Sequence, residues 1–355
     1  MAVTGEISPQ LDQLALMEQF GTEFSTPKFP TWQSELAAAV RTIHELCERL
    51  EIALPSGFLP AVRHFPVLVP ESFLKRMEPG NPHDPLLRQV LPSPEEFTQK
   101  EGFTNDPVGD LNAELAPGLL QKYQGRALLV VTGTCAVHCR YCFRKEYPYE
   151  AAPKSIAQWQ PAIDAIHADR SLREVILSGG DPLILNDQRL GQLIQQLAEI
   201  PHLRRLRIHS RLPVVLPSRI TATLLDSLNA CRLQPIMVVH ANHPQELEND
   251  CGAALQKIVR SGIPVLNQAV LLKGVNDDIE TLTELCENCI NLGIIPYYLH
   301  QLDRVTGTSH FEVDVSLGQR LMAELRDRLP GYAIPRYVHE VAGATSKLPL
   351  DLITV

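Results

Sequence analysis

The chain has 355 residues, and its 32 Lys and Arg against 41 Asp and Glu give a formal net charge of −9. This length predicts two domains of ordinary size or one barrel-sized domain. The negative charge excludes binding of nucleic acid or an anionic membrane by bulk attraction. A hydrophobic content of 45% with 21% charged residues excludes a disordered, collagen-like or coiled-coil chain.

The N-terminal sequence carries no targeting signal. MAVTGEISPQ lacks a basic segment followed by an apolar run, and no window approaches 18 uncharged apolar residues. We therefore expect a cytoplasmic protein without a membrane span. Eight cysteines are too few for a disulfide scaffold in a chain of this length, so their spacing is the informative feature.

Residues 1–120 are rich in proline, as in FPTW and EPGNPHDPLL. Proline interrupts regular elements, so we expect a helical N-terminal extension that is broken in several places. One helix is predicted over 36–50, because its apolar residues recur at helical spacing. These residues are Leu36, Val40, Ile43, Cys47 and Leu50.

After residue 120 the chain alternates between β-branched runs and amphipathic stretches. The predicted strands are 127–132, 174–178, 205–210, 236–240, 264–271 and 294–300. The predicted helices are 155–169, 187–199, 218–231, 244–260 and 278–292. Units of about 30 residues that repeat in this way indicate a parallel sheet with crossover helices.

The turn after the first predicted strand decides between two α/β architectures. A dinucleotide-binding fold would have G-x-G-x-x-G there, whereas this chain has GTCAVHCRYCFR. We therefore predict a partial (β/α)6 TIM-like barrel over residues 121–300, with its chemistry at the carboxyl ends of the strands. Residues 301–355 are the expected C-terminal segment.

Cys135, Cys139 and Cys142 form a CxxxCxxC motif directly after that strand. Thiolates hold iron-sulfur clusters, and three of them on a four-iron cluster leave one iron without a protein ligand. An open position marks a catalytic metal site. The alternative from the residues alone is a zinc site of three cysteines and His138.

The motif resembles that of the radical S-adenosylmethionine (SAM) superfamily. The resemblance narrows to the lysine 2,3-aminomutase family over most of residues 60–350. The segments that carry it are TGTCAVHCRYCFRK, LSGGDPL, SRLPVVLPSRI, HANHPQEL, NQAVLLKGVND, IPYYLHQLD and GYAIPRYVHE. It implies a 4Fe-4S cluster whose open iron binds SAM, and an external one-electron reductant that triggers release of a deoxyadenosyl radical.

The family also uses pyridoxal 5'-phosphate (PLP), held as a Schiff base on a lysine that matches Lys347. A lone Lys347 would otherwise be read as a solvated surface residue. The resemblance implies that Lys122, Tyr123 and Arg126 hold PLP and its phosphate. For SAM it implies the turn Ser178, Gly179, Gly180 and Asp181, with Ser210, His240 and Gln268. From its place at a strand end alone, His240 could equally be a core histidine.

Three further residues match the family's contacts with lysine. Arg144 corresponds to the arginine that binds the carboxylate, a task suited to a bidentate guanidinium. Asp303 and Glu340 correspond to the acids that hold the distal ammonium, and paired carboxylates favour a long cationic side chain. The remaining cysteines lack such a pattern, and Cys286 and Cys289 are expected to pack inside a helix.

The resemblance is greatest to the branch that makes (R)-β-lysine for modification of translation elongation factor P. Three features favour this branch: the motif sequence CAVHCRYCFRK, Glu340 in place of the aspartate of other members, and a chain that ends eight residues after Lys347. It implies an isomerase that is functionally linked to an elongation factor P ligase, with a homodimer as the expected assembly. The rivals are a catabolic aminomutase, a zinc-binding protein, and a radical SAM methyltransferase or maturase without PLP.

Overall fold

The computed structural model describes residues 31–350 except 58 and 154. The first 30 residues of the predicted extension and the last five of the chain therefore lie outside the described residues. One ten-stranded sheet runs through the rest, with its strands in sequence order from β1 to β10. None of the helices in the described ranges is long and apolar enough to cross a membrane.

Seven neighbouring strands, β3 to β9, are parallel; β2 and β10 pair antiparallel with the first and last of them, and β1 pairs antiparallel with β2. The strands are β1 (Glu114–Ala116), β2 (Leu119–Tyr123), β3 (Arg126–Thr132), β4 (Glu174–Gly179), β5 (Arg205–Ser210), β6 (Gln234–Val239), β7 (Val265–Val270), β8 (Ile295–His300), β9 (Arg336–His339) and β10 (Leu348–Pro349). The predicted α/β class with a mostly parallel sheet is confirmed.

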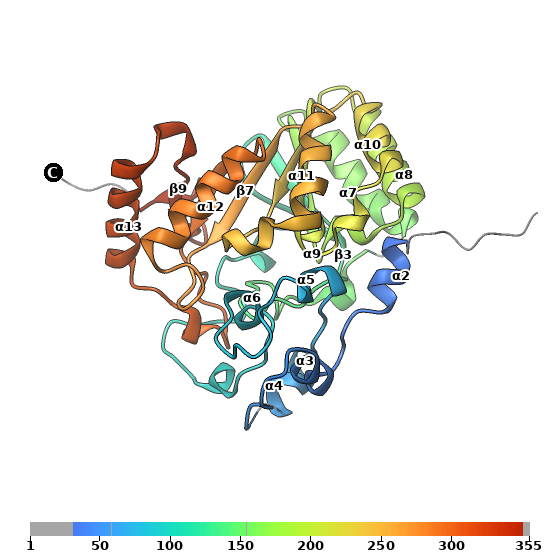
Figure 1. Cartoon of the computed structure of the whole chain (residues 1–355). Coiled ribbons are helices and arrows are strands. Elements are labelled where there is room, and N and C mark those ends of the chain that lie inside the picture. Colours follow the sequence, from blue (N-terminus) through green and yellow to red (C-terminus); the bar gives the residue numbers. More distant parts are fainter. Residues whose placement is uncertain (1–30, 58, 154, 351–355) are drawn as a thin grey trace, which may run out of the picture.

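Crossover helices cover the outer face of this curved sheet (Figure 1). They are α7 (Ile156–Ala168), α8 (Asp187–Ala198), α9 (Leu212–Val215), α10 (Ala222–Asn229), α11 (Asn249–Arg260), α12 (Ile279–Asn291) and α13 (Val315–Arg328). The core lies between helices and sheet. On α8, for example, Leu190, Leu193, Ile194 and Leu197 form one buried stripe at helical spacing.

All six predicted strands are present within two residues of their predicted ends. Two predicted helices are shorter than expected: α10 begins at Ala222, and the window 244–260 starts with a separate 3-10 turn, Pro244–Leu247, before α11. Pro244 fits the first position of that turn, where its missing N–H costs nothing. Helix α13 was not predicted.

The sheet extends across both domain boundaries that the sequence suggested. Strand β2 begins at Leu119, and β9 lies in the expected C-terminal segment. Within the described residues no strand pairing closes the barrel between its two edges. An ion pair from Lys122 on β2 to Glu340, which follows β9, spans this seam with an Nζ–Oε1 distance of 2.9 Å.

The predicted helix over 36–50 is wrong in its continuity. The chain instead forms α2 (Trp32–Ala37) and α3 (Ile43–Arg49), because Val40 pairs with Val69 in an antiparallel bridge and the Thr42 side chain caps the second helix. The apolar stripe is nevertheless largely buried. Further short helices follow: α4 (Leu59–His64), α5 (Glu71–Leu74) and α6 (Pro85–Arg88).

The described residues that precede the sheet, 31–113 except 58, form an N-terminal layer. This layer lies along one side of the barrel (Figure 1) and holds the loop after β3. The amide N–H of His138 donates to the carbonyl of Leu68 at 3.1 Å, and that of Arg140 to the carbonyl of Gln89 at 2.8 Å. The buried Arg140 guanidinium forms a two-point ion pair with Glu96, with N–O distances of 2.9 and 2.5 Å. An irregular loop is thereby fixed by residues 44 to 70 positions earlier in the chain.

We predict that Glu96→Ala lowers the free energy of unfolding by about 3–5 kcal/mol, because it leaves the buried Arg140 without its counter-charge. Glu95→Ala is the matched control, since Glu95 is the exposed neighbour in the same turn. Its cost should be within about 0.5 kcal/mol. Denaturant unfolding of both variants is the measurement, and equal losses would contradict this role of Glu96.

Candidate active site

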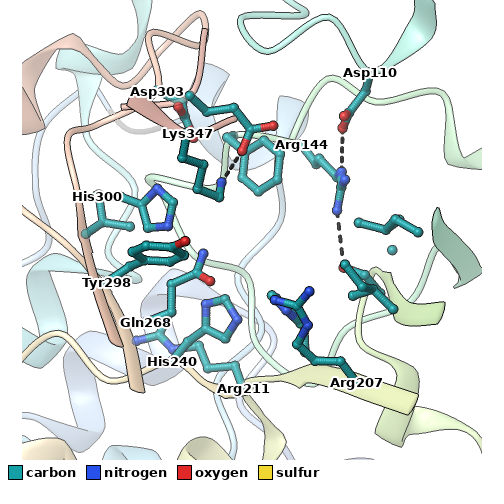
Figure 2. Close-up of a pocket in the computed structure, with 18 of the residues that line it drawn as sticks. Asp110, Arg144, Arg207, Arg211, His240, Gln268, Tyr298, His300, Asp303 and Lys347 are labelled. Carbon is teal, nitrogen blue, oxygen red and sulfur yellow. Dashed lines mark hydrogen bonds and ion pairs between the residues drawn. The ribbon is translucent and has the colours of Figure 1, made fainter. Parts of the chain in front are cut away.

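A cavity of about 740 Å³ opens inside the barrel. Its lining includes residues in the segments that follow β3, β4, β5, β6, β8 and β9, as well as Gln268 on β7. Of the predicted site residues, all but Ser210 line it. These are Cys135, Cys139, Cys142, Lys122, Tyr123, Arg126, Arg144, Ser178, Gly179, Gly180, Asp181, His240, Gln268, Asp303, Glu340 and Lys347. Figure 2 draws 18 of the lining residues around one open space and labels ten of them.

The three motif cysteines are close enough to influence one another's ionisation. Burial raises the pKa of Cys142 to about 11, and the Cys139 thiol adds to the shift. Binding them as thiolates therefore requires a strong positive charge, which iron supplies. Within the described residues no group of three His, Cys, Asp or Glu side chains is placed to hold a single metal ion, but cysteine thiolates are the donors that iron-sulfur clusters take. The trio fits the predicted cluster.

His138 does not join the cysteines. Its ring Nδ1 lies 2.8 Å from the carbonyl oxygen of Pro66, and the ring stacks on Phe65 at a centroid distance of 4.7 Å. It is also absent from the cavity lining. The geometry therefore gives no support to a zinc site of three cysteines and this histidine.

The SGGD turn packs tightly against the cysteine loop. A Cβ atom on Gly180 would lie 2.3 Å from the carbonyl oxygen of Thr134, and one on Gly179 would lie 2.6 Å from that of Thr132. Gly179 also has φ +117°, which other residues rarely adopt. Glycine is required at both positions for this close contact, and the contact of the turn with SAM stays a prediction.

Asp181 and Ser210 connect the turn to the end of β5. The Asp181 carboxylate accepts hydrogen bonds from the Ser210 hydroxyl at 2.7 Å and from the backbone N–H groups of Leu183, Arg211 and Leu212. Burial raises its pKa to about 6 despite these bonds. Their side chains thus fix the loops, and their contact with SAM stays a prediction.

A chain of alternating charges runs along one wall of the cavity. Lys347 and Lys122 both pair with Glu340, and Lys122 also pairs with Asp110 at 2.5 Å. Asp110 in turn pairs with Arg144 Nε at 2.7 Å (Figure 2). Burial opposes the charge of Glu340, but the two ammonium groups lower its pKa to about 2. The predicted lysine-binding and PLP-binding residues therefore form one electrostatic unit.

Asp303 and His300 offer unpaired polar atoms to the cavity. In the described chain, Asp303 Oδ1 and His300 Nε2 are buried and have no hydrogen-bond partner. Burial, reinforced by the charge of Glu340, raises the pKa of Asp303 to about 7. Buried polar atoms are rarely left unsatisfied, so these two indicate that a polar, preferably cationic, ligand completes the site.

Basic groups gather deeper in the barrel. The Arg126 guanidinium lies over the Tyr123 ring at 4.6 Å, and Arg207 also lines the cavity. Within the loop 343–346, which directly precedes Lys347, only Ser346 lines the cavity. An anionic group such as the phosphate of PLP fits the guanidinium groups better than this loop.

Sequence reasoning missed several lining residues, among them Asp110, Arg207, His209, Arg211, Tyr298 and His300. Arg211 and His300 stand inside SRLPVVLPSRI and IPYYLHQLD, so their segments were recognised but their side chains were not singled out. No sequence pattern marks Asp110 as a site residue, because it lies in an irregular loop. The remaining cysteines are as predicted: Cys286 and Cys289 are buried in the core on α12.

We predict that Gly180→Ala displaces the cysteine loop, lowers the free energy of unfolding by about 1–3 kcal/mol and reduces the iron bound per chain after anaerobic reconstitution. Gly191→Ala on α8 is the control, because its new Cβ would meet only the Ser227 hydroxyl oxygen of α10, at an ordinary contact distance of 3.6 Å. Full iron loading in Gly180→Ala would show that the close contact does not shape the site.

Comparisons with known proteins agree with this geometry. A family described as a 4Fe-4S single cluster domain matches residues 124–204. L-lysine 2,3-aminomutase of Escherichia coli strain K12 is 44% identical over 92% of this chain and 96% of its own length, and that of Haemophilus influenzae is 46% identical over 81% and 86%. The enzyme of the same name from Clostridium subterminale is 32% identical over 90% and 77%.

Among solved structures, a radical SAM methyltransferase from Sphaerobacter thermophilus is 21% identical and covers 62% of this chain and 68% of its own. Its TM-score is 0.44, so the description of the fold rests on the sheet itself.

Proposed function

Because the chain belongs to the L-lysine 2,3-aminomutase family, we propose that it converts L-lysine to (R)-β-lysine. The observation that carries the proposal is one cavity lined by the three cysteines, Lys347 and the acid pair Asp303 and Glu340. When bound, the cluster with SAM supplies a radical that abstracts hydrogen, and PLP activates the amino group that migrates.

The residues of the chain position lysine for this chemistry. The Arg144 guanidinium is buried, and Asp110 keeps it charged and oriented, which suits it to bind the substrate carboxylate. Asp303 and Glu340 offer carboxylates to the distal ammonium. Lys347, whose ammonium now pairs with Glu340, is the residue proposed to hold PLP. Substrate lysine brings its own ammonium to this acid pair, so the pocket stays electrically balanced when Lys347 is engaged elsewhere.

The product is proposed to supply the modification of translation elongation factor P. The sequence of the cysteine motif and the presence of Glu340 support this proposal. The chain is also more similar in sequence to the E. coli and H. influenzae relatives than to the clostridial relative. This proposal includes a cytoplasmic location, an external one-electron reductant, a functional link to an elongation factor P ligase and a homodimer. A catabolic lysine aminomutase is the second candidate, because it would use the same cavity.

The test is anaerobic turnover of the reconstituted protein with PLP, SAM, a reductant and L-lysine, followed by chiral separation of the products. (R)-β-lysine is the expected product, whereas (S)-β-lysine would favour the catabolic candidate. We predict that Lys347→Ala abolishes turnover with unchanged iron content, while Lys257→Ala, which removes an exposed lysine of α11, retains it. Activity near wild type in Lys347→Ala would refute the PLP assignment.

We further predict that kcat/KM for lysine rises as the pH increases through about 7, because Asp303 must be ionised to pair with an ammonium and its pKa is raised to about 7. Asp303→Asn should lower kcat/KM about ten- to a hundredfold, as expected for the loss of a charged hydrogen bond, and should remove this inflection.

Asp327→Asn, an exposed change on α13, is the control and should keep the wild-type profile. An inflection near pH 7 that survives in Asp303→Asn would assign it to another group.

A further inference from the structure

The Arg211 side chain reaches one of the three motif cysteines. Arg211 directly follows β5, and its Nη1 lies 2.7 Å from the Cys139 sulfur. The residue is buried, with 7% of its surface exposed, and it also lines the cavity beside His240 (Figure 2). A buried cation therefore donates a hydrogen bond to a sulfur that is expected to bind iron.

Other buried groups hold the second terminal nitrogen of the guanidinium, whereas its Nε has no hydrogen-bond partner among the described residues. Nη2 donates to Gln89 Oε1 at 2.6 Å and to Glu246 Oε2 at 2.9 Å. The ring of Tyr141 lies 5.4 Å from the guanidinium carbon. Gln89 in turn donates to Glu246 at 3.0 Å and accepts from Asn242 at 3.0 Å. These contacts orient Arg211 and leave Nη1 directed at the sulfur.

If Arg211 had a purely structural role, its ion pair with Glu246 would be sufficient to explain its position. That pair uses Nη2, however, and leaves the contact from Nη1 to Cys139 without a structural need. The backbone N–H of Arg211 already links β5 to Asp181. The position of the guanidinium is thus explained best by the sulfur.

We propose that Arg211 is a positioning residue that raises the reduction potential of the iron-sulfur cluster through Cys139. The inference rests on the cluster proposed for Cys135, Cys139 and Cys142. Reduction adds one electron from the external reductant to the cluster and neither forms nor breaks a bond. A nearby cation and a hydrogen bond to a ligand sulfur stabilise the added negative charge. They therefore stabilise the reduced cluster more than the oxidised cluster, which raises the reduction potential.

Gln89 makes the N-terminal layer part of this arrangement. It belongs to the turn that ends α6, and its carbonyl also accepts the amide N–H of Arg140 in the cysteine loop. The layer therefore holds the loop through its backbone and orients Arg211 through a side chain. This gives the layer a role in cluster reduction as well as in folding.

The test is a redox titration of the reconstituted protein without SAM, in which electron paramagnetic resonance measures the reduced cluster. Arg211→Gln should lower the ratio of reduced to oxidised cluster about tenfold at a given potential, which equals a downward shift of about 59 mV for one electron. Arg88→Gln removes the same charge from α6, where the side chain binds the Lys273 carbonyl, and should keep the wild-type midpoint.

Failure of the inference differs from failure of the proposed function. A wild-type protein that assembles no cluster refutes the proposed function, whereas an unchanged midpoint in a loaded Arg211→Gln protein refutes only the role of Arg211. If that variant binds no iron, the role of Arg211 is tested instead on the wild-type protein labelled with 15N-arginine. Pulsed electron paramagnetic resonance of its reduced cluster should detect coupling to a guanidinium nitrogen, and its absence would overturn the inference.

Discussion

The site depends on how the irregular loop that carries the three cysteines is held. Ordering such a loop costs about 1–2 kcal/mol of backbone entropy per residue, and here buried contacts on three sides offset that cost. The N-terminal layer binds its backbone and Arg140, the glycines of the SGGD turn pack on Thr132 and Thr134, and Arg211 reaches Cys139. Each contact joins the loop to a distant part of the chain.

A second constraint is the open seam of the barrel. Within the described residues no strand pairing closes the sheet, and the ion pair of Lys122 on β2 with Glu340 after β9 spans the gap. Through Asp110 the same charges continue to Arg144, so the groups proposed for PLP and for both ends of lysine share one network. A buried network of this kind is costly when half satisfied and rigid when complete, which suits a site that must hold a radical in one geometry.

The strands and the cysteine motif could be predicted from the sequence because β-branched runs, their spacing and CxxxCxxC are local patterns. The break between α2 and α3 could not, because it depends on Val40 pairing with Val69. Asp110 and the partners of Arg211 were missed for the same reason, since only folding brings residues 89, 110 and 246 to the barrel. The requirement for glycine at 179 and 180 could not be predicted either, because it depends on the contact of these residues with Thr132 and Thr134.

The central claim is that one cavity holds the cluster, PLP and lysine together. The most direct measurement is an anaerobic crystal structure of the reconstituted protein with PLP, SAM and L-lysine. We expect the cluster on Cys135, Cys139 and Cys142, and the lysine carboxylate at Arg144 with its distal ammonium between Asp303 and Glu340. Lysine bound outside this cavity, or PLP bound away from Lys347 and Arg126, would contradict the account.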